Sequence, residues 1–346
     1  MDILSSILCR YPRDCRPARI EPLGSAGGMS GAQFWRITSP RGTLALRRWP
    51  IEHPTPDHLR FIHAVIHHAT NRGVDFLPVA ITTCEGESFT QHAGHLWELA
   101  AWMPGTADYE LSPNDAKLRA AMTTLAQFHN AVANFAPPPE VAATLRAAGS
   151  SAIPRRLARL HALTHGEFNE LSSSINDSTW PEFASIARQF IATMPRAVPR
   201  AIAELEPLAN IALPMQLCLR DIWHDHVLFT GNEVTGLIDF GAVDNDTPTT
   251  DIARLLGSLA GEPSLPFRER PLEVSNRSDI WREGLAAYSA TRPLSRNESL
   301  AVFALNTANP ILAGCNWIRW VYIERREFAN SHQIITRFQR LNTLIR

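Results

Sequence analysis

The stretch that decides the fold is residues 219–241, LRDIWHDHVLFTGNEVTGLIDFG. Arg-Asp stands near its start and Asp-Phe-Gly ends it, so that Asp221 and Asp239 lie eighteen positions apart. Two short β-rich runs, 227–230 and 234–238, lie between the two aspartates. Gly-Asn joins these runs, and this dipeptide between alternating apolar residues favours a hairpin turn. The sequence therefore predicts a hairpin that returns the chain and brings both carboxylates to one end of a small ribbon.

Two carboxylates at one end of a hairpin suit the transfer of a phosphoryl group. One can accept the proton of the acceptor hydroxyl, and the other can hold the metal ions that bridge the phosphates of a nucleotide. The structural alternative is an aspartate that caps a turn and another that ends a strand in an ordinary α/β domain. Either aspartate alone fits that alternative well, whereas the whole ordered string favours the catalytic interpretation.

Residues 20–49 predict three strands, with a glycine-rich loop after the first and a Ser-Pro-Arg-Gly turn after the second. Because glycines carry no Cβ atom, the loop would let backbone N–H groups approach phosphate oxygens. The third strand carries Arg47 and Arg48, and only one of them can point into a cleft because successive strand residues face opposite sides. A flexible hairpin with a solvated arginine is the structural alternative. The candidate phosphate-binding residues of the loop are Gly27, Gly28 and Ser30.

A helix is predicted over residues 57–72, because apolar residues recur there at helical spacing. Between positions 58 and 72 this helix contains no acidic residue. A histidine of this helix could pair with Arg47 only weakly, because a neutral imidazole is a weak acceptor for a guanidinium. We therefore expect the histidines in the middle of the helix to lie on the surface. These histidines are His63, His67 and His68.

The second half of the chain predicts mainly helices. The first spans residues 114–135, a polar and helix-rich insertion covers about 137–210, and two or three helices follow a loop at 261–278. Residues 299–318 carry no charge and are long enough to cross a bilayer. Asparagines and a proline in the middle of this run favour instead two buried helices broken at Asn309-Pro310.

Composition indicates a cytoplasmic enzyme that binds neither nucleic acid nor a membrane. Of the 346 residues, 45 % are hydrophobic and 19 % are charged, which excludes general disorder. The net charge of −1 produces no overall field that would attract polyanions. The five cysteines are scattered and odd in number, so reduced thiols are the simplest interpretation. An acidic second residue and a very short apolar run argue against a signal peptide.

Together these motifs resemble the aminoglycoside phosphotransferase family, relatives of protein kinases that phosphorylate small molecules. The resemblance extends over roughly residues 20–325. Asp221 matches the catalytic aspartate of that family, and Asp239 matches its metal-binding aspartate. Asp251, in TTDIARLL, resembles the aspartate that supports the backbone of the catalytic loop. As an acid at the start of an apolar helix, Asp251 also fits a simple capping role.

The resemblance implies an α+β fold with two lobes, a small β-rich nucleotide-binding lobe over residues 1–104 and a larger helical lobe over 105–346. It implies ATP as phosphoryl donor, Mg²⁺ or Mn²⁺ as metal, and the hydroxyl of a small molecule as acceptor. The run at 95–105 resembles the hinge that receives adenine, with hydrogen bonds from the backbone near Ala101 and Met103. The acceptor itself is not readable from the sequence. Carboxylates that are candidates for binding it by position alone are Asp244, Asp246, Glu262 and Glu269.

Four positions depart from the pattern of the family. Leu219 replaces a common histidine, and His226 replaces a metal-binding asparagine. Arg47 replaces the phosphate-binding lysine, and the next helix lacks the glutamate that orients it. Mg²⁺ prefers oxygen ligands, so His226 as a ligand would favour a more nitrogen-tolerant ion, unless Asp225 supplies an oxygen. The alternative to an active kinase is a catalytically impaired pseudokinase that binds a nucleotide or another ligand, although the two retained aspartates favour the enzyme.

Overall fold

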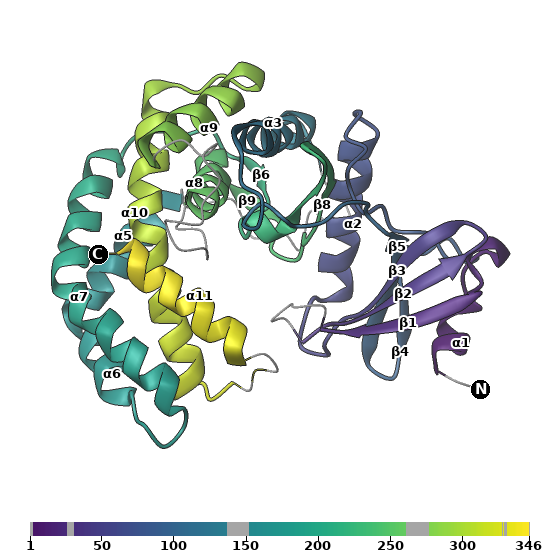
Figure 1. Cartoon of the computed structure of the whole chain (residues 1–346), viewed down its shortest axis with the longest axis horizontal. Coiled ribbons are helices and arrows are strands. Elements are labelled where there is room, and N and C mark those ends of the chain that lie inside the picture. Colours follow the sequence, from purple (N-terminus) through teal and green to yellow (C-terminus); the bar gives the residue numbers. More distant parts are fainter. Residues whose placement is uncertain are drawn as a thin grey trace. The chain divides into compact units, whose positions relative to one another are not determined.

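The computed structural model describes residues 3–25, 31–136, 152–260, 277–326, 328 and 331–345. These residues form two compact units, and each unit takes segments that are far apart in the sequence (Figure 1). The first unit contains the described parts of Met1–Asp108, Gln127–Ala147 and Asp225–Val243. The second contains those of Tyr109–Ala126, Ala148–His224 and Asp244–Arg346. The division into lobes at residue 104 stays a prediction.

An antiparallel sheet of five strands, in the order β1-β2-β3-β5-β4, forms the centre of the first unit. Ile37, Leu46 and Leu99 of this sheet are fully buried and pack with helix α1 (Ile3–Leu8) into one core. The three predicted strands are confirmed, and the run that resembles the hinge begins with an inner strand of the sheet, β5. The strands are β1 (Arg19–Gly24), β2 (Gln33–Ser39), β3 (Gly42–Arg48), β4 (Thr90–His92) and β5 (His95–Ala101).

Helix α2 (Pro56–Thr70) is the main helix of the first unit and confirms the predicted helix. Thr55 caps it, because its hydroxyl oxygen accepts a backbone N–H of the first turn at 3.2 Å. His67 is exposed and His68 is partly exposed, as predicted. His63 lies on the buried face and is only 8 % exposed, so the prediction that it lies on the surface is wrong.

The predicted hairpin is present, since β7 (Val227–Thr230) pairs antiparallel with β8 (Glu233–Leu237). Gly231 in the turn has a φ of +63°, a left-handed conformation that glycine adopts without steric cost. The hairpin packs against the segment that follows β5. A Cβ atom on Gly105 would lie 2.7 Å from the carbonyl oxygen of Phe229, so glycine is needed for this close approach.

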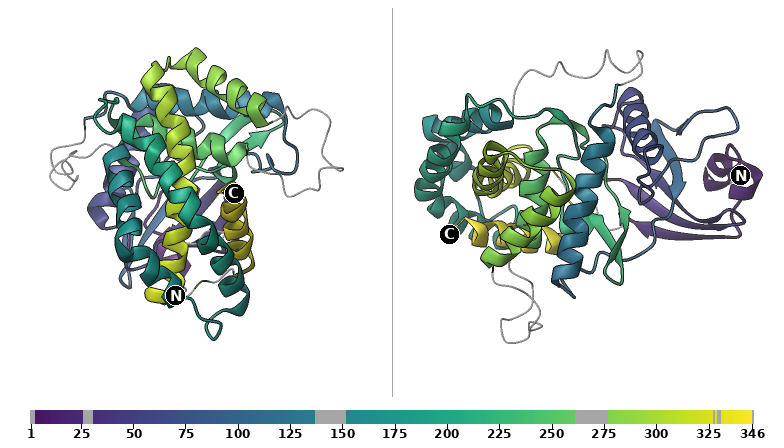
Figure 2. Two further views of the ribbon diagram at one scale, coloured as in Figure 1. Left: turned by 90° about the vertical axis from the view of Figure 1, so that its left-hand side faces the viewer. Right: turned by 90° about the horizontal axis from the view of Figure 1, so that it is seen from above.

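The second unit is mainly helical. Its central helix, α10 (Arg296–Ile318), packs against α7 (Pro181–Leu205), α8 (Pro248–Leu259) and α11 (Ser331–Leu344). Figure 2 shows α10, in yellow-green, beside the teal α7. A Cβ atom on Gly314 would lie 2.0 Å from the ring of Phe190 on α7, so glycine allows the two helices to pack closely. The other elements are α3 (Asp115–Val132, of which the part up to Ala126 belongs here), α5 (Ala152–Ala162), a π-helix (Leu163–Glu167), α6 (Phe168–Ser174), β6 (Gln216–Cys218), β9 (Asp244–Asp246) and α9 (Arg277–Thr291).

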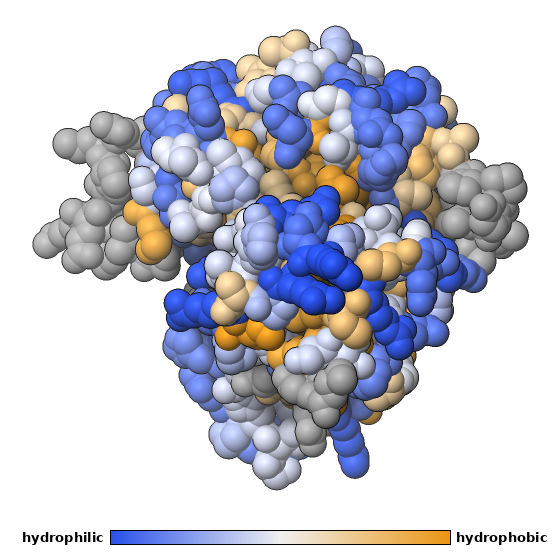
Figure 3. All heavy atoms as spheres, turned by 90° about the vertical axis from the view of Figure 1, so that its right-hand side faces the viewer, coloured by the Kyte–Doolittle hydropathy of each residue, from blue (hydrophilic) through white to orange (hydrophobic). Residues whose placement is uncertain are grey.

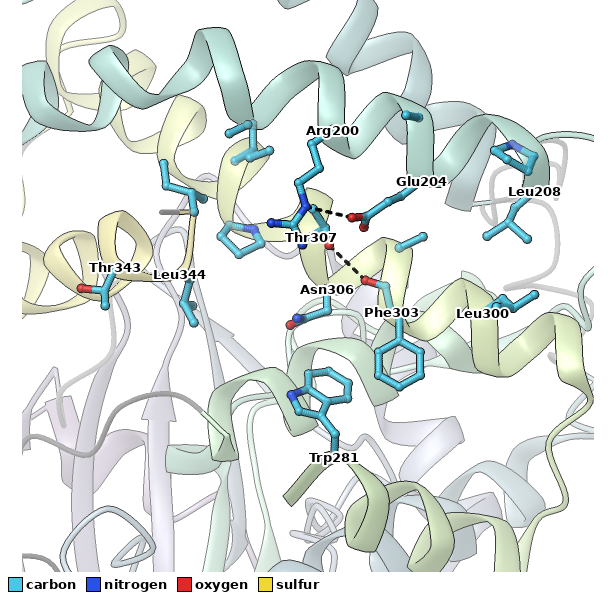
Figure 4. Close-up of a pocket in the computed structure, with 17 residues that line it drawn as sticks. Arg200, Glu204, Leu208, Trp281, Leu300, Phe303, Asn306, Thr307, Thr343 and Leu344 are labelled. Atoms are coloured by element: carbon cyan, nitrogen blue, oxygen red, sulfur yellow. Dashed lines mark hydrogen bonds and ion pairs between the residues drawn. The ribbon is translucent and has the colours of Figure 1, made fainter. Parts of the chain in front are cut away.

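The predicted insertion is helical over residues 152–205, and its first part, 137–151, lies outside the described residues. Helix α10 runs unbroken through Asn309 and Pro310, so the prediction of two helices broken there is wrong. A proline inside a helix costs about 3 kcal/mol, but packing of α10 against three other helices outweighs that local cost. Within the described ranges, no helix combines the length and the apolarity needed to cross a membrane. Hydrophilic side chains cover most of the face seen in Figure 3, and apolar ones show mainly in its hollows.

Candidate active site

A buried carboxylate holds the backbone just before Asp221. Asp251 on α8 has no exposed surface and accepts hydrogen bonds from the N–H groups of Leu219 at 2.6 Å and Arg220 at 2.7 Å. Arg220 has a φ of +65°, a left-handed conformation that costs a non-glycine residue about 1–2 kcal/mol. Two hydrogen bonds to an ionised carboxylate are strong enough to offset that cost. The support of this loop that the sequence suggested for Asp251 is therefore present.

The other end of the same loop is also tied down. The N–H of His224 donates to the hydroxyl oxygen of Ser258 at 2.9 Å, and His224 Nε2 lies 3.2 Å from Glu110. Glu110 also forms an ion pair with Arg340 on α11. The hydrogen bond from His224, with the charges of His224 and Arg340, outweighs partial burial and lowers the pKa of Glu110 to about 2. The backbone on both sides of Asp221 is thus fixed to helices of the second unit.

Asp221 itself presents a carboxylate that is 50 % exposed. Its Oδ1 atom accepts a hydrogen bond from Trp223 Nε1 at 3.0 Å and pairs with the guanidinium of Arg254 on α8. A half-exposed carboxylate on a fixed backbone can reach a bound molecule and keep its orientation. This geometry is suited to a general base.

Asp239 lies in the first unit, two residues beyond the end of β8. Its φ is +67°, another left-handed conformation of a non-glycine residue, and its side chain is 46 % exposed. His226 Nε2 lies 3.7 Å from Asp239 Oδ2 and 3.6 Å from Asp225 Oδ1. The imidazole thus has two carboxylates within ion-pair distance, and carboxylate oxygens and imidazole nitrogens are both groups that can bind divalent cations. The residues predicted from the sequence as metal ligands, Asp239 and His226, are therefore neighbours.

Arg47 is held by a carboxylate of the adjacent strand. Arg47 on β3 is the cross-strand partner of Glu98 on β5, and Arg47 Nη1 lies 3.9 Å from Glu98 Oε1. The Arg47 guanidinium also lies 3.2 Å from the ring centroid of Trp49. Burial lowers the pKa of Arg47, whereas the charges of Glu98 and Asp239 oppose that shift. Of the two arginines on this strand, Arg47 is therefore the one that is buried beside carboxylates of the first unit.

His63 of α2 completes this group from the other side. Its Nε2 donates to Glu98 Oε2 at 2.6 Å, and its Nδ1 lies 2.8 Å from the hydroxyl oxygen of Ser88. Burial alone would raise the pKa of Glu98, but the hydrogen bond and charge of His63, together with the charge of Arg47, hold that pKa below its ordinary value. Glu98 on β5 thus supplies beside Arg47 the negative charge that no residue between positions 58 and 72 of the helix provides.

Sequence reasoning missed Glu98, although a signal was available. Glu98 is the only charged residue between positions 96 and 103, in an otherwise apolar strand. A carboxylate in such a strand requires a partner when the strand is buried. Its partner is set by the pairing of β3 with β5, which cannot be read from the local pattern of either strand.

We expect Glu98→Gln to destabilise the protein. Arg47 and Glu98 have side chains only 14 % and 12 % exposed, so loss of the carboxylate leaves a buried guanidinium without its counter-ion. The expected loss in the free energy of unfolding is about 2–3 kcal/mol, measured by urea denaturation. Glu87→Gln is the matched control, since Glu87 is 56 % exposed and pairs with Arg60 on the surface. That control should change the free energy by less than about 1 kcal/mol, and equal effects of both substitutions would contradict the role of Glu98.

The other predicted nucleotide-binding residues lie at the hinge and in the glycine-rich loop. The N–H of Ala101 donates to the Val79 carbonyl at 3.3 Å, and the N–H of Trp102 donates to the Thr43 carbonyl at 3.1 Å. Met103 is buried, and no hydrogen bond of its N–H occurs among the described residues. The loop residues Gly27, Gly28 and Ser30 lie outside the described residues.

Two of the four carboxylates suggested for the acceptor are already paired with arginines. Asp244 lies 3.0 Å from Arg220, and Asp246 lies 3.1 Å from Arg155. Both pairs belong to the second unit, near the loop that carries Asp221. The other two, Glu262 and Glu269, lie outside the described residues.

Comparison with known proteins identifies the family. The model of the phosphotransferase enzyme family matches residues 21–294, which is most of the chain. The chain belongs to this phosphotransferase family. The resemblance noted from the sequence motifs is confirmed, and so is the expected class of enzyme, a phosphotransferase with an alcohol group as acceptor.

Several homoserine kinases are similar to this phosphotransferase in sequence. That of Bradyrhizobium diazoefficiens is 25 % identical over 314 residues, which cover 89 % of this chain and 79 % of that protein. That of Methylocella silvestris is 31 % identical over 150 residues, which cover 42 % of this chain and 44 % of that protein. The first match shows that the likeness extends over most of both chains.

Solved structures of other small-molecule kinases share the fold of this phosphotransferase. A spectinomycin phosphotransferase in complex with ADP and spectinomycin has a TM-score of 0.64 and 13 % identity, covering 94 % of this chain and 92 % of that one. An amicoumacin kinase in complex with AMP-PNP, Ca²⁺ and its substrate has a TM-score of 0.60 and 13 % identity, covering 98 % and 91 %. The predicted protein-kinase-like fold is therefore confirmed.

Proposed function

We propose that this phosphotransferase transfers the γ-phosphoryl group of ATP to the hydroxyl of a small molecule, with Asp221 as the general base. The observation that carries the proposal is a half-exposed carboxylate on a loop that Asp251 and Ser258 hold at both ends. In the reaction, the hydroxyl oxygen forms a bond to the γ-phosphorus while the bond to the β,γ-bridging oxygen breaks. The hydroxyl proton passes to Asp221, and ADP leaves.

The first unit would bind the nucleotide. Arg47 would contact the phosphates, together with Gly27, Gly28 and Ser30 of the glycine-rich loop. The N–H of Met103 would donate to adenine, and the backbone near Ala101 would line the same site. Glu98 and His63 would keep the Arg47 guanidinium in one position, so that little entropy is lost when phosphate binds.

Asp239 and His226 would hold the divalent metal, Mg²⁺ or Mn²⁺. A metal bound there supplies positive charge that screens the phosphates of the nucleotide. Asp225 is a further candidate ligand, since its Oδ1 atom also lies within ion-pair distance of His226 Nε2.

Homoserine is the first acceptor to test, because homoserine kinases are among the proteins similar to this chain in sequence. We also propose a cytoplasmic location, since all five cysteines are free thiols. ADP release with ATP and either Mg²⁺ or Mn²⁺ should be measured across a panel of hydroxylated metabolites that includes homoserine. Turnover of one of them supports the enzyme. If the protein binds nucleotide but neither phosphorylates any of these compounds nor hydrolyses ATP, the result would instead support the pseudokinase.

The metal preference tests the role of His226. Nitrogen ligation favours Mn²⁺ over Mg²⁺, so we expect the ratio of kcat/KM with Mn²⁺ to that with Mg²⁺ to fall in His226→Asn, which replaces the imidazole by an amide oxygen. The effect should be about 10-fold or less, because Asp239 and Asp225 remain. His92→Asn on β4 is the control for a histidine outside this group. An unchanged ratio in His226→Asn would mean that the imidazole is not a ligand.

A further inference from the structure

Arg254 is the cation that contacts the candidate base. It lies on α8 one helical turn after Asp251, and therefore beside the loop that Asp251 supports. Its guanidinium pairs with Asp221 and lies 5.3 Å from the ring centroid of Trp223. The Arg254 side chain is 19 % exposed and that of Asp221 is 50 % exposed. The Arg254 guanidinium is thus the more buried member of the ion pair. Loss of the pair would therefore be more unfavourable for Arg254 than for Asp221, which water can solvate.

Arg254 belongs to a group of arginines in which other members have carboxylates of their own. Arg155 and Arg220 are paired with Asp246 and Asp244, as described above. Arg156 donates to the side-chain oxygen of Asn309 at 3.0 Å. Burial lowers the pKa of Arg156 to about 10; the charge of Asp246 opposes this shift, and the positive charges of Arg254, Arg155 and Arg220 add to it. The surroundings of Arg254 are therefore rich in positive charge. These arginines are Arg155, Arg156, Arg220 and Arg254.

In the proposed reaction, the Asp221 carboxylate would have to serve both as the counter-ion of Arg254 and as the general base. Among the described residues, Asp221 is the only carboxylate within ion-pair distance of Arg254. As a base, Asp221 must turn an oxygen toward the acceptor hydroxyl, whereas its Oδ1 atom is held by the guanidinium of Arg254. Release of Asp221 would leave the more buried guanidinium without a counter-ion, which is strongly unfavourable. An anionic group on the acceptor would remove this conflict by taking the place of Asp221.

The guanidinium of Arg254 has a donor available for such an anion. Its Nε is buried and has no hydrogen-bond partner within the part of the chain that the structure describes. A carboxylate can accept two parallel N–H bonds from one edge of a guanidinium, and such pairs are among the strongest hydrogen-bonded contacts in proteins. An acceptor that offered only an ammonium group would meet like charge at these arginines. The carboxylates of Asp244 and Asp246 could not compensate, because they are already paired with Arg220 and Arg155.

We propose that Arg254 binds a carboxylate group of the acceptor and that this contact frees Asp221 to accept the hydroxyl proton. The inference rests on the proposed function, because it concerns the acceptor of the same reaction. It assigns the acceptor to the class of small hydroxy acids and hydroxylated amino acids. Arg254 is the residue that determines this specificity, and binding of the correct acceptor prepares the base.

Acceptor pairs that differ only in the carboxylate test this inference. L-homoserine and 3-amino-1-propanol form one pair, and glycerate and glycerol form another. For each compound kcat and KM are measured by ADP release, and hydrolysis of ATP by water is measured without acceptor. We expect the wild type to favour the carboxylated member of at least one pair by about 10–100-fold in kcat/KM.

Substitution of Arg254 should remove that preference. In Arg254→Gln the KM of the carboxylated acceptor should rise about 10–100-fold relative to that of its partner, so that the ratio of the two kcat/KM values falls to about threefold or less. Arg254→Lys keeps the charge and should keep part of the preference. Arg282→Gln is the matched control, because Arg282 is 70 % exposed on α9 and also forms an ion pair, with Asp279. This control should behave as the wild type does.

Other outcomes would contradict the inference or the proposed function. A preference that is absent from the wild type, or that survives in Arg254→Gln, overturns it. An equal loss of kcat with both members of a pair also overturns it, because Arg254 would then act on the transferring phosphoryl group. If ATP is hydrolysed but none of the four compounds is phosphorylated, the carboxylate inference fails and the phosphotransferase function stands. If the wild type does not hydrolyse ATP either, the proposed function fails with it.

Discussion

Asp221→Asn is expected to reduce kcat by about 10²–10⁴ while the Kd of ATP stays nearly unchanged. Asparagine has the same shape as aspartate and can still accept the hydrogen bond from Trp223, but it cannot take the hydroxyl proton. The residues proposed to bind the nucleotide belong to the first unit, whereas Asp221 belongs to the second. In this variant kcat should therefore fall while the affinity for ATP is retained. The first is measured by ADP release and the second by calorimetric titration with ATP.

A second aspartate provides the control for this experiment. Asp177 is an exposed aspartate of the second unit that also pairs with an arginine, Arg188, at 2.9 Å. Asp177→Asn should leave kcat unchanged. If Asp221→Asn retains the kcat of the wild type, Asp221 is not the base, and the assignment of the catalytic loop is wrong.

Asp239→Asn should weaken the binding of ATP in the presence of Mg²⁺ or Mn²⁺ by about 10–100-fold and abolish turnover. Asparagine is the appropriate replacement because it tolerates the left-handed conformation that Asp239 adopts, so the backbone is preserved. The amide lacks the negative charge that holds the metal. Affinity for ATP is measured by titration with and without the divalent cation.

The dependence on metal distinguishes this role from a structural one. In the wild type the metal should strengthen ATP binding, and in Asp239→Asn it should have little effect. Asp14→Asn, in an exposed ion pair with Arg41, is the control within the first unit. Equal ATP affinity of the wild type with and without metal would rule out the proposed function of Asp239.

Local features of the sequence were sufficient to predict the sheet, helix α2 and the hairpin β7–β8. Alternation in strands, helical spacing and the Gly-Asn turn are short-range patterns, and each determines structure over fewer than about twenty residues. The support of the loop before Asp221 by Asp251 also followed from a motif. The roles proposed for Asp221 and Asp239 came from the order of residues in one stretch and remain to be tested.

The features that were missed depend on contacts between distant segments. Glu98 acquires its role from the pairing of β3 with β5, and His63 is buried because it meets Glu98. Helix α10 continues through Pro310 because packing against neighbouring helices outweighs a local preference for a break. The contact between Arg254 and Asp221 follows from the position of Arg254 three residues after Asp251, but its partner could not be identified before the loop was placed.

The position of Glu98 has a consequence for regulation. In protein kinases the acid that pairs with the phosphate-binding cation lies on a mobile helix, and displacement of that helix switches the enzyme off. In this chain both members of the pair lie on adjacent strands of one sheet, joined by the backbone hydrogen bonds of β3 and β5. A movement of α2 would remove the contribution of His63 but would leave Arg47 and Glu98 together. If Arg47 contacts phosphate as we propose, displacement of α2 alone should therefore not separate this cation from its acid.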